Sequence, residues 1–477
     1  MKIHDYNEPD TKFKLYLRQL LTALGPLMGI IVTCMTNGYS AILLPQLKTI
    51  SSNNNESLSG SADVDHFGAL TIDQVSWIAA APVLSMAPGY WTGGFMADKL
   101  GRKTSVLLLF PVSFVGWLMI GFANSVKALV AGRLLIGYCV GILAPIVPIY
   151  VGETSDPLLR GVLLGAISLN LSVGILACHA MGTWLHWRTT AHICGVLPMV
   201  CWIICMFSRE SPMWLLSKGR LEQARRSWVF FRGEYSLEEF SLLGTAKLAE
   251  ISDRKAGEHS MLHSFRKTWS SRYFLRPLAI ICLYFFTLQF AGTNMIIFYC
   301  VEMIADISGS AYAYLITLMI DAIRLMFGVL ACFLMKTCRR RTITFISGFG
   351  VAVTILSLSA CLMLDIGRPW VPIVLLVAYT ALLSLGLMPV PWLLCGELLP
   401  RKFRGLGTGL TSGFAFICFF MVIKTMPAMM ELMKPKGAFV IYGSVALIGI
   451  SILYFVLPET KNKTLQEIQI YFDQTSH

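Results

Sequence analysis

The feature that most constrains this chain is its succession of long apolar segments. A helix needs about 20 mostly apolar residues to cross a bilayer. Segments of this kind follow one another twelve times, with limits near 21–45, 74–97, 104–124, 127–151, 161–184, 189–207, 277–300, 312–335, 342–364, 370–396, 405–427 and 437–457. The pattern predicts an all-α membrane protein with twelve transmembrane helices.

The composition supports this prediction and excludes other classes. Hydrophobic residues make up 55% of the 477 residues and charged residues only 14%, where a soluble chain carries about 25%. This excludes a soluble enzyme and a disordered chain. The first apolar segment is too long, and lacks the cleavage site, to be a signal peptide. We therefore expect the first helix to remain in the protein.

The sequence also lacks the patterns of enzymatic and ATP-driven chemistry. We find no phosphate-binding loop, nucleophile–base pair or dinucleotide fingerprint. Most of the 13 cysteines lie inside apolar segments at no metal-ligand spacing, and they are predicted to be small apolar side chains. We predict no enzymatic activity, no cofactor and no metal site.

Lys and Arg placement predicts the orientation, since an even number of spans puts both termini on one side. Most of the 39 basic residues fall on the side of the termini, and we count Arg133, near the start of its span, with them. The other side holds Lys48, Lys127, Arg188, Arg368, Lys434 and Lys436. The positive-inside rule then places both termini in the cytoplasm of a multi-pass plasma-membrane protein. The net charge of +12 needs no nucleic-acid partner.

Two segments outside the spans have distinct predicted roles. The charged 208–276 segment is amphipathic in stretches such as Leu221 to Phe231, and we expect short cytoplasmic helices there. The polar stretch from Ser51 to His66 is expected to be an external loop. It contains Asn55-Glu56-Ser57, an acceptor pattern for N-glycosylation at Asn55.

The two halves of the chain repeat each other. At an offset of 244 residues, Pro145, Gly152, Glu153, Arg160, Gly161 and Gly165 fall on Pro389, Gly396, Glu397, Arg404, Gly405 and Gly409. At a nearby offset, the basic hairpin 98–103 falls on 336–341. Parallel repeats of this kind are typical of carriers whose halves rock about a central site. We predict an N-terminal bundle (1–207), a linker (208–276), a C-terminal bundle (277–457) and a tail (458–477).

Several motifs resemble those of the sugar porter family of the major facilitator superfamily. They are Gly94 to Lys103, Arg133 with Gly137 and Gly141, Gly152-Glu153, Arg160-Gly161, Glu210-Ser211-Pro212, Pro391-Trp392, Gly396-Glu397, Arg404-Gly405 and Pro458 to Lys461. Lys424-Thr425 and Leu398-Leu399-Pro400 are most similar to insect-type facilitated trehalose and hexose transporters. The resemblance implies the major facilitator fold and a monomeric sugar transporter.

The hairpin motifs are expected to form gating ion pairs at the cytoplasmic rim. Asp98 and Arg102 flank a turn at Gly101 and can pair with helix ends, with Glu153 or with Arg160; the resemblance adds Arg133. The alternative is simple anchoring by positive charge.

The second copy departs from the pattern, because Lys336 stands in place of the acid and Arg339 in place of the glycine. We expect Lys336 or Arg341 to pair there with Glu397, with Arg404 retained.

Gly292 interrupts the seventh span between Gln289 and Asn294. Such a break frees backbone groups, which are tolerated at membrane depth only beside protein or a cavity. The resemblance implies that Gln289, Asn294 and Trp392 contact a sugar. The alternatives are interhelical hydrogen bonding for the amides and packing near Pro389 and Pro391 for Trp392.

Other substrate positions of the family are altered. Ser168 replaces a glutamine, Arg324 an asparagine, Leu288 the first glutamine of span seven, and Ala415-Phe416 an Asn-Trp pair. Arg324 either pairs with Asp321 on its own helix or faces the cavity and donates to hydroxyls or to an anionic substrate. These departures leave a non-transporting sugar sensor and an organic ion carrier as alternative functions.

The driving force follows from one position of the first span. Proton-coupled relatives place an acid after Gly-Tyr, whereas Ser40 follows Gly38-Tyr39 here. We therefore predict facilitated diffusion of a hexose or trehalose, with Asp321 as a substitute proton site if coupling exists. His179, His186 and His192 are expected to be satisfied or interfacial side chains.

Overall fold

The structure is a computed structural model. It describes residues 9–56, 70–245, 272–309, 312–365, 368, 370–400 and 403–461, with residues 463, 467 and 472. Within these ranges, the side chains of 9–12, 49–56 and 307–308 are not described.

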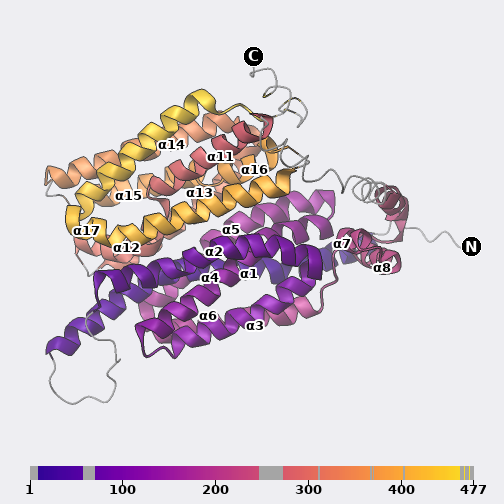
Figure 1. The fold of residues 1–477 in the computed structure, drawn as a ribbon, viewed down its shortest axis with the longest axis horizontal. Helices are drawn as coiled ribbons and strands as arrows, with labels where there is room; N and C mark the ends of the chain where they lie inside the picture. Colours follow the sequence, from indigo (N-terminus) through magenta and orange to yellow (C-terminus); the bar gives the residue numbers. More distant parts are fainter. Residues whose placement is uncertain are drawn as a thin grey trace, which may run out of the picture.

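The first half of the chain forms one helical bundle, drawn in indigo to magenta in Figure 1. Its helices are α1 (Pro9–Glu56), α2 (Ile72–Leu100), α3 (Arg102–Gly121), α4 (Val126–Thr154), α5 (Pro157–Trp184) and α6 (Trp187–Met206). Then come α7 (Pro212–Ser217), α8 (Leu221–Arg232) and the short 3-10 helix η1 (Glu234–Ser236). These three short helices lie together at one end of the molecule, which we call the linker end (Figure 1).

The second bundle lies beside the first and is drawn in orange to yellow (Figure 1). Its elements are α11 (Arg272–Phe290), α12 (Thr293–Ser308), α13 (Ala313–Thr337), α14 (Arg340–Met363), α15 (Trp370–Leu382), the π-helical turn η4 (Leu383–Leu387), α16 (Val390–Leu398) and α17 (Arg404–Val456). The predicted all-α fold with twelve crossing segments is confirmed.

The helices match the predicted spans with informative differences. Ten described helices are long and apolar enough to cross a membrane; α2 adds a further segment, and α17 holds two. It reverses at Lys434, whose φ of 58° breaks the helix just before Pro435. The predicted outer connection near Lys434 and Lys436 is thus a sharp turn. The external loop also begins later than predicted, because α1 stays helical through Glu56.

Helix ends follow local sequence signals. Thr71 and Gln74 form a capping box that starts α2. Asp156 caps α5, with Pro157 at its first position, and Ser211 caps α7 in the same way before its own proline. The start of α7, the first short helix of the linker, is thereby specified by the Glu-Ser-Pro motif itself.

Glycines allow two helices of the first bundle to approach closely. A Cβ atom at Gly137 would lie 2.0 Å from the carbonyl oxygen of Pro82, and one at Gly141 would lie 2.3 Å from that of Met86. No larger residue fits there without moving the backbone. This is the packing that small residues provide between membrane helices, and it explains why the motif after Arg133 needs glycine.

The predicted span 370–396 is interrupted by the π-helical turn η4. Such turns leave backbone groups to be satisfied elsewhere. The Ser347 hydroxyl donates to the carbonyl of Leu382 at 2.6 Å and accepts from the backbone N–H of Leu387 at 2.8 Å. One buried serine of α14 therefore supports the irregular helix that leads to Trp392.

Candidate substrate site and gating contacts

The seventh span is broken at Gly292, as predicted. Gly292 is left-handed, with φ 84° and ψ 15°, and separates α11 from α12. The Tyr379 hydroxyl donates to the carbonyl of Ala291 at 2.8 Å, and the Thr293 hydroxyl donates to that of Leu288 at 2.7 Å. Side chains therefore satisfy carbonyl groups that the break frees, which keeps the irregular backbone stable inside the bundle.

Gln289 and Asn294 meet across this break. The Asn294 amide donates to the Gln289 side-chain carbonyl at 2.5 Å, and both residues are buried. Their mutual bond leaves an N–H₂ donor on Gln289 and a carbonyl acceptor on Asn294. Among the described residues, neither of these groups has another side-chain partner. A donor next to an acceptor suits a pair of vicinal hydroxyls.

Trp392 belongs to an aromatic cluster one helical turn from Gln289. Its ring lies edge to face with Phe285 of α11 at 4.8 Å and tilted against Phe416 of α17 at 6.3 Å. Phe416 in turn contacts Tyr90 of α2, in the other bundle, at 5.9 Å. Trp392 stays 43% exposed, so part of its apolar surface remains open.

Ser168 lies on a face of α5 that opens toward the linker end. Farther from that end, His179 and Ser172 on this face are buried, whereas Ser168 is exposed. Nearer the linker end, a Cβ atom added at Gly165 or Gly161 would meet no atom within 4 Å. The same holds for Gly396, Gly405 and Gly409 in the second bundle. The motif glycines at the linker end therefore face open space in both bundles.

Arg324 makes the ion pair that the sequence left as one of two alternatives. Its Nη1 lies 2.8 Å from Oδ1 of Asp321, and both side chains are almost completely buried. The sequence did not reveal a third member of this cluster. Nδ1 of His179, on α5 of the other bundle, lies 2.5 Å from Oδ2 of Asp321.

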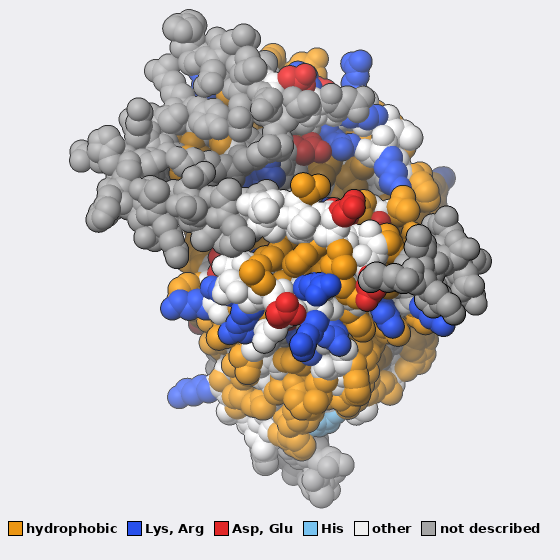
Figure 2. Space-filling view, turned by 90° about the vertical axis from the view of Figure 1, so that its right-hand side faces the viewer, with side chains coloured by type: hydrophobic (Ala, Val, Ile, Leu, Met, Phe, Trp, Pro, Cys, Tyr) orange, Lys and Arg blue, Asp and Glu red, His pale blue; other side chains and the backbone are white. Residues whose placement is uncertain are grey.

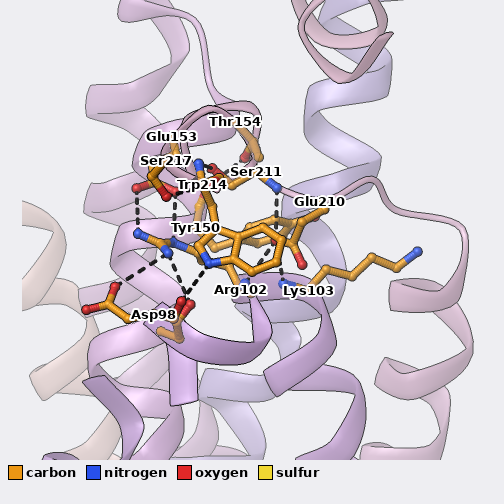
Figure 3. A network of polar contacts seen from close by, with 12 residues as sticks. Asp98, Arg102, Lys103, Tyr150, Glu153, Thr154, Glu210, Ser211, Trp214 and Ser217 are labelled. Carbon is orange, nitrogen blue, oxygen red and sulfur yellow. Dashed lines mark hydrogen bonds and ion pairs between the residues drawn. The ribbon is translucent and has the colours of Figure 1, made fainter. Parts of the chain in front are cut away.

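The first hairpin motif forms a network at the linker end, shown in Figure 3. Arg102 Nε lies 3.0 Å from a Glu153 carboxylate oxygen, and Nη2 donates to the other oxygen at 3.1 Å. Asp98 is more distant, at 3.6 Å, and its side chain is 81% exposed. The Ser211 hydroxyl also donates to Glu153. The predicted pair of Arg102 with Glu153 is thus present and ties α3 to α4 within one bundle.

Glu210 closes this network from the side of the linker. Its carboxylate accepts from the backbone N–H groups of Arg102 and Lys103, at 2.9 and 3.0 Å, and from that of Ser211. A carboxylate at a helix N-terminus satisfies donors that lack a partner in the helix. The Glu-Ser-Pro motif therefore fastens the linker to the start of α3.

The second bundle repeats the network, but with a different arginine from the one we predicted. Arg340 Nη2 lies 3.3 Å from Glu397, and the Thr460 hydroxyl also donates to Glu397. Lys336 and Arg341 were predicted for this role, and within the described residues neither pairs with Glu397. The offset that matches 98–103 with 336–341 puts Arg340 at the position of Arg102. The partner of Glu397 is therefore found by aligning the two repeats, and not by asking which residue replaces the missing acid.

Glu459 of the tail takes the place of Glu210. It accepts from the backbone N–H groups of Arg340 and Arg341 at 3.0 and 3.2 Å, and from those of Thr460 and Lys461. Burial alone would raise the pKa of Glu459, but these backbone hydrogen bonds outweigh it and lower the pKa below its usual value. The tail is thereby fastened to α14 as the linker is to α3.

Arg133 does not lie at the rim where we predicted it. It is fully buried near the end of α4 farthest from α7 and α8, where it donates to the carbonyls of Thr36 and Ile78 and to the Ser40 hydroxyl. The sequence analysis was therefore wrong to group Arg133 with the basic residues of the linker end.

Arg160 and Arg404 lie at the linker end, as expected, but the described contacts do not include the ion pairs predicted for them. Arg160 donates to the carbonyl of Ser155, and Arg404 is the first residue of α17.

Ion pairs join the two bundles at the end opposite the linker, and the sequence analysis missed them. Lys424 of α17 lies 2.6 Å from Asp73 and donates to the Ser76 hydroxyl, both of α2. Lys48 of α1 lies 3.0 Å from Glu302 of α12. The sequence signal that could have revealed this contact is Lys424, a charged residue inside the apolar segment 405–427. Asn55 lies in the last turn of α1, but its side chain is outside the described part of the structure.

The fold and these contacts define a multi-pass membrane protein made of two related helical bundles that surround a polar break. A family model described as "Sugar (and other) transporter" matches residues 19–472, and the chain belongs to this family. Its members are transporters, not enzymes.

Known relatives agree with this assignment. The chain is 30% identical over 459 residues to the facilitated trehalose transporter Tret1 of Polypedilum vanderplanki, covering 94% of this chain and 87% of the relative. It is also 30% identical over 457 residues to Tret1 of Drosophila mojavensis, covering 94% of this chain and 51% of the relative. The chain thus spans about half the length of that relative and of other Drosophila homologues that it matches.

Solved structures share the fold. The inward-open xylose transporter XylE from E. coli superimposes with a TM-score of 0.76 at 19% identity, covering 96% of this chain and 99% of XylE. A partially occluded inward-open form of XylE gives 0.73 at 21% identity, covering 95% and 100%.

Proposed function

We propose that this protein is a facilitative sugar transporter that moves a hexose or trehalose down its gradient by alternating access. The observation that carries the proposal is the broken seventh span, where the amides of Gln289 and Asn294 pair and where Phe285, one turn before Gln289, contacts the 43% exposed residue Trp392. The amides suit hydroxyls, and the ring suits the apolar face of a sugar. The names of the Tret1 relatives support the same substrate class.

The linker end is proposed to face the cytoplasm of a plasma-membrane protein, with both termini on that side. Figure 2 looks onto this end and shows Lys and Arg side chains gathered among hydrophobic ones. This agrees with the positive-inside rule. We further propose that one copy of the chain suffices, because the site lies between its own two bundles.

Alternating access follows from the distribution of contacts between the bundles. At the outer end, the pairs Lys424–Asp73 and Lys48–Glu302 hold the bundles together. At the cytoplasmic end, the motif glycines Gly161, Gly165, Gly396 and Gly405 face open space, and the bundles meet where Trp91 of α2 donates to the carbonyl of Gly409. We assign this arrangement to a state closed to the outside, and rocking must exchange the outer ion pairs for contacts at the cytoplasmic rim.

Two features favour uniport of a neutral sugar. Ser40 occupies the position where proton-coupled relatives carry an acid. Its hydroxyl accepts from Arg133, whose other described hydrogen-bond partners are backbone carbonyls. Arg324 is paired with Asp321 and almost completely buried, which argues against the organic anion carrier, because an anionic substrate would need a cation that it can reach. The amide pair would bind sugar in a transporter and in a non-transporting sensor alike. A measurement of sugar flux is therefore needed to distinguish these two functions.

The test is uptake of labelled glucose and trehalose by cells without sugar carriers of their own. We expect saturable uptake that a proton uncoupler leaves unchanged. Gln289→Ala removes the free donor and should raise KM about tenfold. Asn124→Ala, which removes an amide between α3 and α4, is the matched control and should leave KM unchanged. Sugar binding without flux would reject transport, and uptake abolished by the uncoupler would reject uniport.

A further inference from the structure

The cluster of His179, Asp321 and Arg324 connects three helices and both bundles. Nδ1 of His179 lies 2.5 Å from Oδ2 of Asp321, and its Nε2 lies 3.1 Å from the carbonyl oxygen of Gly38 in α1. Nη1 of Arg324 lies 2.8 Å from the other Asp321 oxygen. All three residues are 2% exposed. The cluster lies toward the outer end, five residues before the end of α5 at Trp184.

Both contacts of His179 are hydrogen bonds for only one count of protons. A carbonyl oxygen only accepts, so the contact with Gly38 is a hydrogen bond when Nε2 carries a hydrogen. The other ring nitrogen faces a carboxylate oxygen, so a hydrogen must lie between them, on either Nδ1 or Asp321. The pair therefore holds one proton more than a neutral imidazole beside a carboxylate. If that proton leaves, a lone pair faces an oxygen at a buried contact, where an unmade hydrogen bond is costly.

The surroundings leave this proton as the variable charge. The ionisable groups of neighbouring helices that interact with Asp321 or Arg324 are Cys34 of α1, Cys178 of α5, Cys300 of α12 and Tyr379 of α15. These thiols and the phenol are ordinarily neutral at physiological pH. Arg324 contacts the Asp321 oxygen that His179 does not contact.

From this geometry we propose that His179 and Asp321 form a proton-binding site that locks the two bundles together at the outer end. The lock rests on the alternating access proposed above, because opening the outer end must separate α5 from α13. When it opens, the proton passes from the pair to external water, and it returns from the same side. Sugar flux thus depends on external pH, but no proton is carried across the membrane.

The sign of the pH dependence follows from linkage. A proton bound more tightly in the outward-closed state stabilises that state, so acid holds the lock shut and alkali releases it. An imidazole in water titrates near pH 6.5. The effect therefore develops above that pH, with at most a tenfold change per pH unit for one proton.

The experiment is sugar exchange in proteoliposomes that contain the purified full chain, with the same pH on both sides, from about pH 5.5 to 8.5. We expect exchange by the wild type to rise about threefold or more between about pH 6.5 and 8.5. His179→Asn should flatten this profile. His192→Gln is the matched control, because His192 stacks on Phe122 within the first bundle, and it should keep the wild-type profile.

A second variant and a second readout complete the test. If His179→Asn does not fold, Asp321→Asn combined with Arg324→Asn removes both charges of α13 and should flatten the profile equally. A flat wild-type profile, or a His179 variant with the wild-type slope, would overturn the proposal. Proton entry driven by sugar, followed with a pH dye inside the vesicles, would overturn the one-sided lock but not sugar transport. Absence of any exchange would overturn the transport function first.

Discussion

At the scale of single residues, two carboxylates perform the same task in the two bundles. Glu153 accepts from Arg102 and Ser211, and Glu397 accepts from Arg340 and Thr460. The side chains of the two glutamates are 21% and 25% exposed. Partly buried, charge-assisted hydrogen bonds are stronger than surface ion pairs, so these contacts stabilise the rim of each bundle.

We predict that Glu153→Gln lowers the stability of the purified protein by about 1–3 kcal/mol. Glu397→Gln should cost a similar amount, and the two costs should add, because the residues share no partner. Thermal unfolding in detergent measures both. Asp98→Asn is the control and should cost less than about 0.5 kcal/mol, since Asp98 is exposed. If Asp98→Asn cost as much as Glu153→Gln, the importance that we give to Glu153 would be wrong.

At the scale of elements, one backbone position separates α11 from α12. Gly292 adopts a left-handed conformation, in which an L side chain costs about 1–2 kcal/mol. A Cβ atom there would still find room, since its nearest neighbour, the Tyr379 hydroxyl, lies 3.6 Å away. The requirement for glycine is therefore one of backbone conformation and not of space.

Gly292→Ala is accordingly expected to lower stability by about 1–2 kcal/mol and to reduce sugar uptake, because the break positions Gln289 and Asn294. Thermal unfolding and labelled uptake check the two effects. Gly94→Ala, at a helical position with no atom within 4 Å, should leave stability unchanged or raise it by up to about 1 kcal/mol. Wild-type stability in Gly292→Ala would show that this conformation is not required.

The sequence predicted these local features because their signals are local. The helix break, its amides and the tie of Arg102 to Glu153 all follow from motifs of a few residues. The partner of Glu397 was missed because we selected side chains by the replaced acid instead of by the register of the repeat. His179 and Asp321 are 142 residues apart, and only the packing of α5 against α13 brings them together, so no motif could reveal the pair.

At the scale of the whole molecule, the two bundles touch through charged contacts at the outer end. Lys424 also lies over the ring of Trp77, at 4.4 Å from its centroid, so one cation contacts an acid, a hydroxyl and an aromatic ring of α2. Each of the two pairs has one solvent-exposed member, Asp73 at 75% and Lys48 at 52% exposure of the side chain, and ion pairs that solvent reaches contribute only about 0–1 kcal/mol each. Their small free energies leave the closed state easy to open, as a carrier requires.

A crosslink at this contact should therefore stop transport. We expect a short thiol-reactive crosslinker to join the bundles in the double variant Asp73→Cys, Lys424→Cys and to block sugar uptake, while each single variant keeps its flux after the same treatment. Most of the native cysteines are buried free thiols, so background reaction should be low. Full transport by the crosslinked double variant would contradict rocking of the bundles.

One short helix belongs to both the site and the outer closure. Asn294 begins α12 beside the helix break, and Glu302, eight residues further along the same helix, bonds to Lys48 of the first bundle. The two residues lie on either side of a kink, because Tyr299 between them has non-helical angles of φ −128° and ψ 15°. A bound molecule that changes the bend at Tyr299 therefore also moves the carboxylate that bonds to Lys48.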